Sequence, residues 1–191
     1  LHFHRKREDG FHELETNFQM VSLYDEIELE SQSSGIELEC NTSGIPEDSA
    51  NLAYKAALLL KKFCQVKDRG VHIRLKKHIP AGAGLGGGSG NAAGVLMGLN
   101  LLWDLNLKKE KLSILSSELG SDVPFFLTSP RALGVGRGEN LEILEPSLKF
   151  QVLLVFPGFP ITTSWVYQNL KLKLTKRENN ISILRKNLSL S

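Results

Sequence analysis

The sequence has 191 residues, of which 41% are hydrophobic and 23% are charged, and its formal net charge is +2. These values are typical of a soluble globular protein with room for one domain, or for one domain and part of a second. A net charge this small does not indicate a nucleic-acid-binding or membrane-surface protein, and every apolar run is far shorter than the ~18 residues of a membrane-spanning helix.

The two cysteines, Cys40 and Cys64, are far apart in the sequence and lack the spacing of metal ligands. Their number allows one disulfide, but free thiols in a reducing cytoplasm fit this cysteine usage better, so we expect a cytoplasmic protein. Residues 1–7 do not have the pattern of a signal peptide and do not start with Met. We therefore expect the sequence to begin inside a longer protein.

The first half of the chain alternates strand-like and helical patterns. Residues 19–30 end in apolar/polar alternation, and residues 36–40 repeat it after a short Ser/Gly segment, which predicts a β-hairpin. Apolar residues then recur at helical spacing from Asn51, which predicts a helix that ends before Asp68. Residues 71–75 alternate again and predict a strand that leads into a glycine-rich segment.

The second half continues the mixture of helices and strands. A run from Ser89 to Trp103 is apolar on most faces and predicts a central, buried helix. A shorter helix is predicted at 109–119, and strands are predicted at 132–136, 141–144 and 151–156. This order of elements, without a repeat, predicts an α+β fold.

The most informative segment is 79–94, in which seven of the sixteen residues are glycine. A backbone with so few side chains lets a ligand approach closely, and its N–H groups can all face one way. The helix that follows adds its unpaired N-terminal donors and the positive end of its dipole. Such a cradle binds anions, most often phosphate, so we predict that the chain binds a nucleotide.

Two common glycine-rich motifs are disfavoured. Gly82-x-Gly84-x-x-Gly87 formally satisfies the dinucleotide fingerprint, but the acidic residue at the expected distance, Asp104, ends a Leu-rich helical stretch rather than a second strand. No Gly-Lys-Ser/Thr follows, which excludes a P-loop. A turn with incidental glycines is the remaining alternative, and it would waste about 0.5–1 kcal/mol of backbone entropy at each glycine.

Residues 80–93 follow the pattern Pro-x-x-x-Gly-Leu-Gly-Gly-Gly-Ser-x-Asn-Ala-Ala, which resembles the phosphate-binding motif of the GHMP kinase superfamily. The three glycines before Ser89 resemble one branch, the kinases that act on 4-diphosphocytidyl-2-C-methyl-D-erythritol. Segments 9–16 (Asp-Gly-Phe-His-Glu-Leu-Glu-Thr), 119–126 (Leu-Gly-Ser-Asp-Val-Pro-Phe-Phe) and 132–139 (Ala-Leu-Gly-Val-Gly-Arg-Gly-Glu) are similar to further segments of that branch, in the same order.

The resemblance implies a GHMP kinase fold. Residues 1–148 should form the N-terminal, ATP-binding domain, a mixed sheet with helices like that of ribosomal-protein domains. Residues 149–191 should begin a ferredoxin-like C-terminal domain. The family's opening Pro-Ala-Lys-x-Asn motif, with its lysine beside the catalytic Asp, would precede Leu1, and the third glycine-rich motif of the family is absent. We therefore expect the sequence to be the middle of an enzyme.

The resemblance also implies a reaction, the ATP-dependent phosphorylation of the substrate's 2-hydroxyl, with ATP and Mg²⁺ and a small-molecule partner, in the non-mevalonate route to isoprenoids. A kinase must orient an alcohol and take its proton, and a carboxylate suits that task. Asp122 matches the family's catalytic base. The alternative is that Asp122 caps a helix or pairs with a cation.

The residues implied in ATP binding form the glycine-rich segment and its two flanks. They are Asn51, Lys77, Pro80, Ala81, Gly82, Ala83, Gly84, Leu85, Gly86, Gly87, Gly88, Ser89 and Gly90. Of these, Asn51 and Lys77 resemble positions of the adenine pocket, and Ser89 could help to hold phosphates or Mg²⁺. Gly90 departs from the branch, which usually has a second Ser there. No histidine has the spacing of a protein metal site.

Aromatic residues are implied in recognition of the substrate's cytosine. Phe11 and His12 follow an Asp-Gly turn, where a ring can stack on a base and an imidazole can bind its edge. Tyr167 is the candidate for a second stacking ring, with plain core packing as its alternative.

Two other functions remain open. Another GHMP kinase, of the homoserine or mevalonate type, would share the glycine motif, although those substrates carry no base for Phe11 and His12 to recognise. A non-catalytic RNA- or partner-binding module would share the domain architecture, which also occurs in ribosomal and translation-factor domains.

Overall fold

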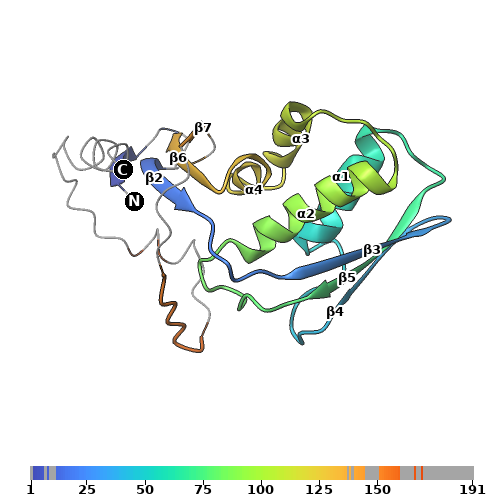
Figure 1. Ribbon diagram of the computed structural model, residues 1–191, viewed down its shortest axis with the longest axis horizontal. Coiled ribbons are helices and arrows are strands. Elements are labelled where there is room, and N and C mark those ends of the chain that lie inside the picture. The colour runs from blue at the N-terminus through green and yellow to red at the C-terminus, as the bar shows by residue number, and fades with distance from the viewer. Residues whose placement is uncertain are drawn as a thin grey trace.

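The computed structural model describes residues 2–6, 8, 12–136, 138, 140–144, 151–159, 166 and 169, of which residues 2, 3, 5, 6 and 12 are described by their backbone alone. One antiparallel sheet and one mixed sheet lie at opposite ends of the described structure, and helices lie between them and over the mixed sheet (Figure 1). The mixture of strands and helices confirms the predicted α+β class.

One sheet has three strands in the order β3 (Glu26–Gln32), β5 (Gly70–Lys76) and β4 (Ile36–Cys40). The central strand β5 is antiparallel to β3 and parallel to β4. The predicted hairpin of β3 and β4 is therefore wrong, because β5 lies between the two strands.

The connection between β3 and β4 passes around the start of β5. The amide of Val71 donates to the carbonyl of Gly35 at 3.2 Å. A Cβ at Gly70 would lie 2.3 Å from the carbonyl oxygen of Ser34, so only glycine fits at the first position of β5. Strands on either side of a central one are ~10 Å apart, and a connection of three residues can span that distance.

Helices α1 (Leu52–Phe63) and α2 (Gly87–Leu102) cover one face of this sheet (Figure 1). The α2 helix approaches β3 so closely that a Cβ at Gly94 would lie 2.6 Å from Ile27 Cδ1 and one at Gly98 would lie 2.4 Å from Leu29 Cδ1. Fully buried residues from both helices and from β5 form the core here, among them Ala53, Ala57, Leu60, Val71, Ile73, Val95, Leu96 and Leu99. The predictions for α1, β5 and the buried helix α2 are confirmed.

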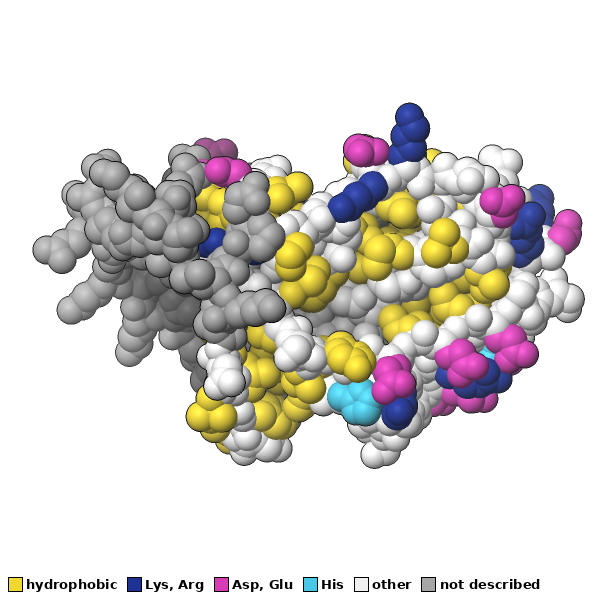
Figure 2. All heavy atoms as spheres, viewed as in Figure 1, with side chains coloured by type: hydrophobic (Ala, Val, Ile, Leu, Met, Phe, Trp, Pro, Cys, Tyr) yellow, Lys and Arg dark blue, Asp and Glu magenta, His cyan; other side chains and the backbone are white. Residues whose placement is uncertain are grey.

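The opposite face of the three-stranded sheet carries charged residues, which Figure 2 shows with acidic and basic side chains intermixed. Arg74 pairs with Glu30 at 2.8 Å and with Glu28 at 3.3 Å, and Lys76 pairs with Glu26 at 3.0 Å. These basic residues of β5 therefore form ion pairs with the glutamates of β3, as expected for a solvated face of a sheet.

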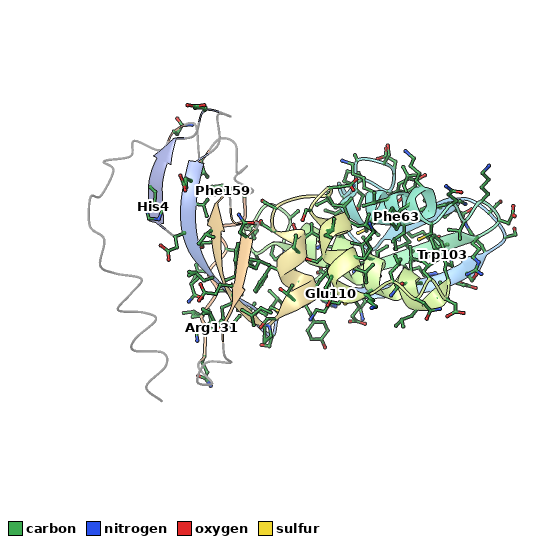
Figure 3. The ribbon with its side chains drawn as sticks, turned by 90° about the horizontal axis from the view of Figure 1, so that it is seen from above. His4, Phe63, Trp103, Glu110, Arg131 and Phe159 are labelled. Carbon is green, nitrogen blue, oxygen red and sulfur yellow. The ribbon has the colours of Figure 1, made fainter. Side chains whose placement is uncertain are left out.

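Two shorter helices, α3 (Lys109–Ser116) and α4 (Val123–Thr128), pack against α2. The first begins as predicted at Lys109 and ends three residues before the predicted boundary, whereas α4 was not predicted. Trp103, at the C-cap of α2, is 1% exposed and lies in the helical half of the molecule (Figure 3).

The second sheet is antiparallel throughout, in the order β1 (His2–Lys6), β2 (His12–Gln19), β6 (Arg131–Gly136) and β7 (Asn140–Ile143). The predictions for β6 and β7 are confirmed, whereas β1 and β2 were not predicted. This sheet carries His4 and Arg131, far from Trp103 in Figure 3.

The predicted strand at 151–156 is wrong, because these residues have no regular secondary structure. The segment pairs with no strand among the described residues, and the side chain of Leu153 is 88% exposed. The predicted domain boundary at 148 falls within residues 145–150, outside the described residues, and so does most of the predicted C-terminal domain. That division remains a prediction.

Candidate functional site

The glycine-rich segment forms a tight loop between β5 and α2. Gly82, Gly84 and Gly86 have φ values of +69°, +73° and +67°, in the left-handed region that side chains disfavour. Gly86 is the N-cap of α2 and provides no side-chain cap for the helix. The spacing of the glycines therefore reflects an alternation of left-handed positions that leads directly into the helix.

Most amide groups of this loop have no acceptor among the described residues. The first hydrogen bond after the loop runs from the Gly90 amide to the Gly86 carbonyl at 2.8 Å. Within the described chain, no backbone N–H from Gly84 to Ser89 donates to a protein acceptor, whereas residues 81 and 82 form a turn. A Cβ at Gly84 would meet nothing within 4 Å. The loop thus presents a set of free donors beside the positive end of α2, which is the arrangement that binds phosphate.

Phe126, from α4, packs against the helix side of the loop. A Cβ at Gly86 would lie 2.9 Å from Phe126 Cζ, and one at Gly90 would lie 3.5 Å from Phe126 Cδ1. Gly86 is therefore required both by its backbone conformation and by this ring. The contact packs α4, which Asp122 immediately precedes, against the start of α2.

Asp122 precedes α4 at the N-cap position, but its side chain accepts no capping hydrogen bond. Among the described residues it has no ion pair. The residue is exposed, yet neighbouring atoms partly desolvate its carboxyl and raise its pKa above the ordinary 3.8, while the Ser121 hydroxyl, at 3.4 Å from Oδ1, acts in the opposite direction. Among the described residues, the Asp122 carboxylate thus neither makes a capping hydrogen bond to α4 nor pairs with a cation, and its role as the catalytic base stays a prediction.

Lys77 turns inward beside the start of α2. Its side chain is 8% exposed, and its ammonium pairs with the carboxylate of Asp25, whose side chain is 1% exposed. A Cβ at Gly87 would lie 3.2 Å from Lys77 Nζ, so the ammonium lies next to the first residue of the helix. Asp25 was not predicted from the sequence.

Asn51 has a structural task in the described chain. Its Oδ1 accepts from the amide of Ala53 at 2.9 Å, and its Nδ2 donates to the carbonyl of Pro46 at 2.7 Å, so it caps α1. The next residue, Leu52, lies beside the glycine loop, since a Cβ at Gly88 would be 3.6 Å from its Cδ1. The role of Asn51 in ATP binding stays a prediction, and so do the roles of Lys77 and the loop residues.

The residues predicted to recognise cytosine are not placed by the structure. Phe11 and Tyr167 lie outside the described residues, and His12 is described only as the first residue of β2, opposite Lys6 of β1. Along β2, His12 lies about 20 Å from Phe18, whose ring stacks on Phe125 of α4 at 5.0 Å. Of the predicted cytosine residues, only His12 can therefore be related to Asp122, through strand β2 and helix α4.

A family model, the GHMP kinases N terminal domain, matches residues 51–129. The 4-diphosphocytidyl-2-C-methyl-D-erythritol kinase of Chlorobium phaeobacteroides is 43% identical over 186 residues, which are 97% of this chain and 64% of that protein. The kinase of the same name from Citrifermentans bemidjiense is 48% identical over 168 residues, 87% of this chain and 60% of that protein. The chain belongs to the 4-diphosphocytidyl-2-C-methyl-D-erythritol kinase family.

Solved structures agree with this membership. A crystal structure of 4-(cytidine 5'-diphospho)-2C-methyl-D-erythritol kinase matches with a TM-score of 0.78 and 36% identity, over 98% of this chain and 66% of that one. A homoserine kinase from Cytophaga hutchinsonii matches with a TM-score of 0.55 and 19% identity, over 65% of this chain and 44% of that one, which shows a shared fold alone. The expected GHMP kinase fold is confirmed, and the chain spans about three fifths of the length of the curated relatives it matches.

Among the described residues, no group of three or more His, Cys, Asp or Glu side chains could hold a metal ion. No helix in this part of the chain is both long enough and apolar enough to cross a membrane.

Proposed function

We propose that the full-length protein transfers the terminal phosphoryl group of ATP to the 2-hydroxyl of 4-diphosphocytidyl-2-C-methyl-D-erythritol, in the non-mevalonate pathway of isoprenoid biosynthesis. The observation that carries the proposal is the set of amides from Gly84 to Ser89 that have no acceptor among the described residues, in a chain of this kinase family. A cytoplasmic location goes with it, since Cys40 and Cys64 are both free thiols.

In this reaction the loop amides stabilise the negative charge that builds up on the transferred phosphoryl group. Asp122 orients the hydroxyl and takes its proton as the bond to phosphorus forms. Its raised pKa supports that role, because a carboxylate with a higher pKa is a stronger base. Phe11, His12 and Tyr167 hold the cytosine.

Mg²⁺ could be held near the loop by oxygen atoms. This ion prefers oxygen ligands and is commonly held by phosphates together with one or two protein groups. The Ser89 hydroxyl, on the first turn of α2, and the Asp122 carboxylate are the side-chain oxygens that could hold it. When bound, it would neutralise phosphate charge.

The test is an assay of the full-length protein with ATP and the CDP-linked substrate, repeated with homoserine and with mevalonate. We expect ADP formation with the first acceptor only. Asp122→Asn should lower kcat by about 10²–10⁴-fold, as loss of a general base does. Glu118→Gln, the same change at an exposed carboxylate beyond the end of α3, is the control. Normal turnover by Asp122→Asn would show that Asp122 is not the general base. Turnover of homoserine or mevalonate would show that the proposed acceptor is wrong.

A further inference from the structure

Asp25 is a buried carboxylate at the end of the connection between β2 and β3. Its Oδ1 accepts two hydrogen bonds, from the amides of His78 and Ile79, both at 2.8 Å. Its Oδ2 pairs with the ammonium of Lys77. One side chain thus binds three consecutive residues that lie more than fifty positions later in the sequence, immediately before Pro80 and the glycine loop.

The neighbouring carboxylate, Glu26, makes similar contacts but is not buried. Glu26 also accepts from a lysine and a histidine, Lys76 at 3.0 Å and His78 at 3.0 Å, but its side chain is 52% exposed and both contacts are on the surface. The Asp25 side chain is 1% exposed. Removing a charge from water is costly, and a buried ion pair is retained only where further hydrogen bonds satisfy it, as the two backbone amides do at Asp25.

The position of the ammonium adds a second reason. Lys77 Nζ lies beside Gly87, at the N-terminal end of α2, where the helix dipole is positive and a cation is unfavourable. Asp25 supplies the negative charge that keeps the ammonium there. Burial acts to raise the pKa of Asp25, but its hydrogen bonds with Ile79, Lys77 and His78 outweigh this and hold the pKa below 3.8, so the carboxylate stays charged at neutral pH.

We propose that Asp25 is a positioning residue of the nucleotide site: it fixes the Lys77 ammonium and the backbone of residues 77–79, from which the glycine loop starts, and so controls the affinity for ATP. The proposal rests on the proposed function, because it takes ATP as the ligand. Asp25 itself need not touch the nucleotide. Its effect is on ATP binding rather than on the acceptor or on proton transfer.

The test is Asp25→Asn in the full-length protein. The amide oxygen of Asn can still accept from the backbone N–H groups of residues 78 and 79, whereas its NH₂ cannot pair with an ammonium. The amide of Lys77 keeps its own hydrogen bond to Asn41 Oδ1 at 2.8 Å, so the segment retains one tether and the fold should survive. Glu26→Gln, the same chemical change at the neighbouring exposed carboxylate, is the matched control.

We expect Asp25→Asn to raise the KM for ATP, and the Kd of a non-hydrolysable ATP analogue, by about 10- to 100-fold, the usual effect of losing a hydrogen-bonded charge pair. The KM for the acceptor and kcat should stay within about twofold, and Glu26→Gln should leave all constants near wild type. A merely structural role would lower the melting temperature without separating the two KM values. Because Asp25 acts through Lys77, the double variant with Lys77→Met should bind ATP no more weakly than Lys77→Met alone.

Wild-type ATP affinity in a folded Asp25→Asn protein would overturn the inference and leave the proposed function intact. An equal rise in both KM values would overturn it as well. If Asp25→Asn does not fold, Lys77→Met decides, because it keeps the carboxylate and its two backbone donors; unchanged ATP affinity there would again overturn the inference. A wild-type protein that binds no ATP would remove the proposed function, and this inference with it.

Discussion

Replacing Gly86 by alanine is the most direct perturbation of the loop. The φ of +67° costs an L-residue about 1–2 kcal/mol. The new Cβ would also lie 2.9 Å from Phe126 Cζ, and such overpacking costs about 1–3 kcal/mol when the neighbour cannot move away. The two effects together predict that Gly86→Ala destabilises the protein by about 2–5 kcal/mol.

Gly84→Ala separates the two effects, because Gly84 has a similar φ of +73° but nothing within 4 Å of its Cβ position. It should cost only the backbone part, about 1–2 kcal/mol. Urea unfolding of both variants, followed by circular dichroism, measures the difference between them. Adding Phe126→Leu should reduce the cost of Gly86→Ala and leave that of Gly84→Ala nearly unchanged. If Gly86→Ala were no more destabilising than Gly84→Ala, the contact between the loop and α4 would be refuted.

Three further outcomes are expected. Gly90 lies within α2, and its Cβ position is at an ordinary van der Waals distance, 3.5 Å, from Phe126. Gly90→Ala should therefore stabilise the protein by about 0.5–1 kcal/mol in urea unfolding, and a loss of stability would contradict this. Asn51→Ala should destabilise the protein by about 0.5–2 kcal/mol in the same measurement, the usual effect of losing an N-cap; unchanged stability would contradict the capping role. Because the folded-state pKa of Asp122 is raised, the wild type should lose stability relative to Asp122→Asn as the pH rises from 3.8 through that pKa, and melting temperatures of both proteins between pH 4 and 7 test the sign.

Helices α1, α2 and α3 and the glycine loop could be predicted because their causes are local. Periodic apolar residues produce α1, a run that is apolar on most faces produces α2, and the glycines allow the left-handed positions at Gly82, Gly84 and Gly86. The order of the strands could not, since β5 enters between β3 and β4 only after a helix has intervened. For β2 the local signal is the spacing of Leu14, Thr16 and Phe18, which places these residues on one face of the strand.

Asp25 could not have been found from one sequence. It stands next to Glu26, and both are carboxylates that pair with a lysine, so residue type and spacing do not distinguish them. What differs is burial, 1% against 52% of the side chain, and that follows from the return of residues 77–79 to the start of β3. The tertiary fold, rather than any local pattern, turns one of the two carboxylates into part of the site.

The aromatic residues explain how the proposed base can be held at a fixed place relative to a loop without side chains. Phe18 of β2 stacks on Phe125 at 5.0 Å, Phe125 meets Phe126 edge-on at 5.3 Å, and Phe126 packs against Gly86. This row of rings runs from the second sheet, through α4, to the start of α2. Since Asp122 immediately precedes α4, its position relative to the loop amides is set by packing between rigid elements, as the alignment of an acceptor hydroxyl with a phosphoryl group requires.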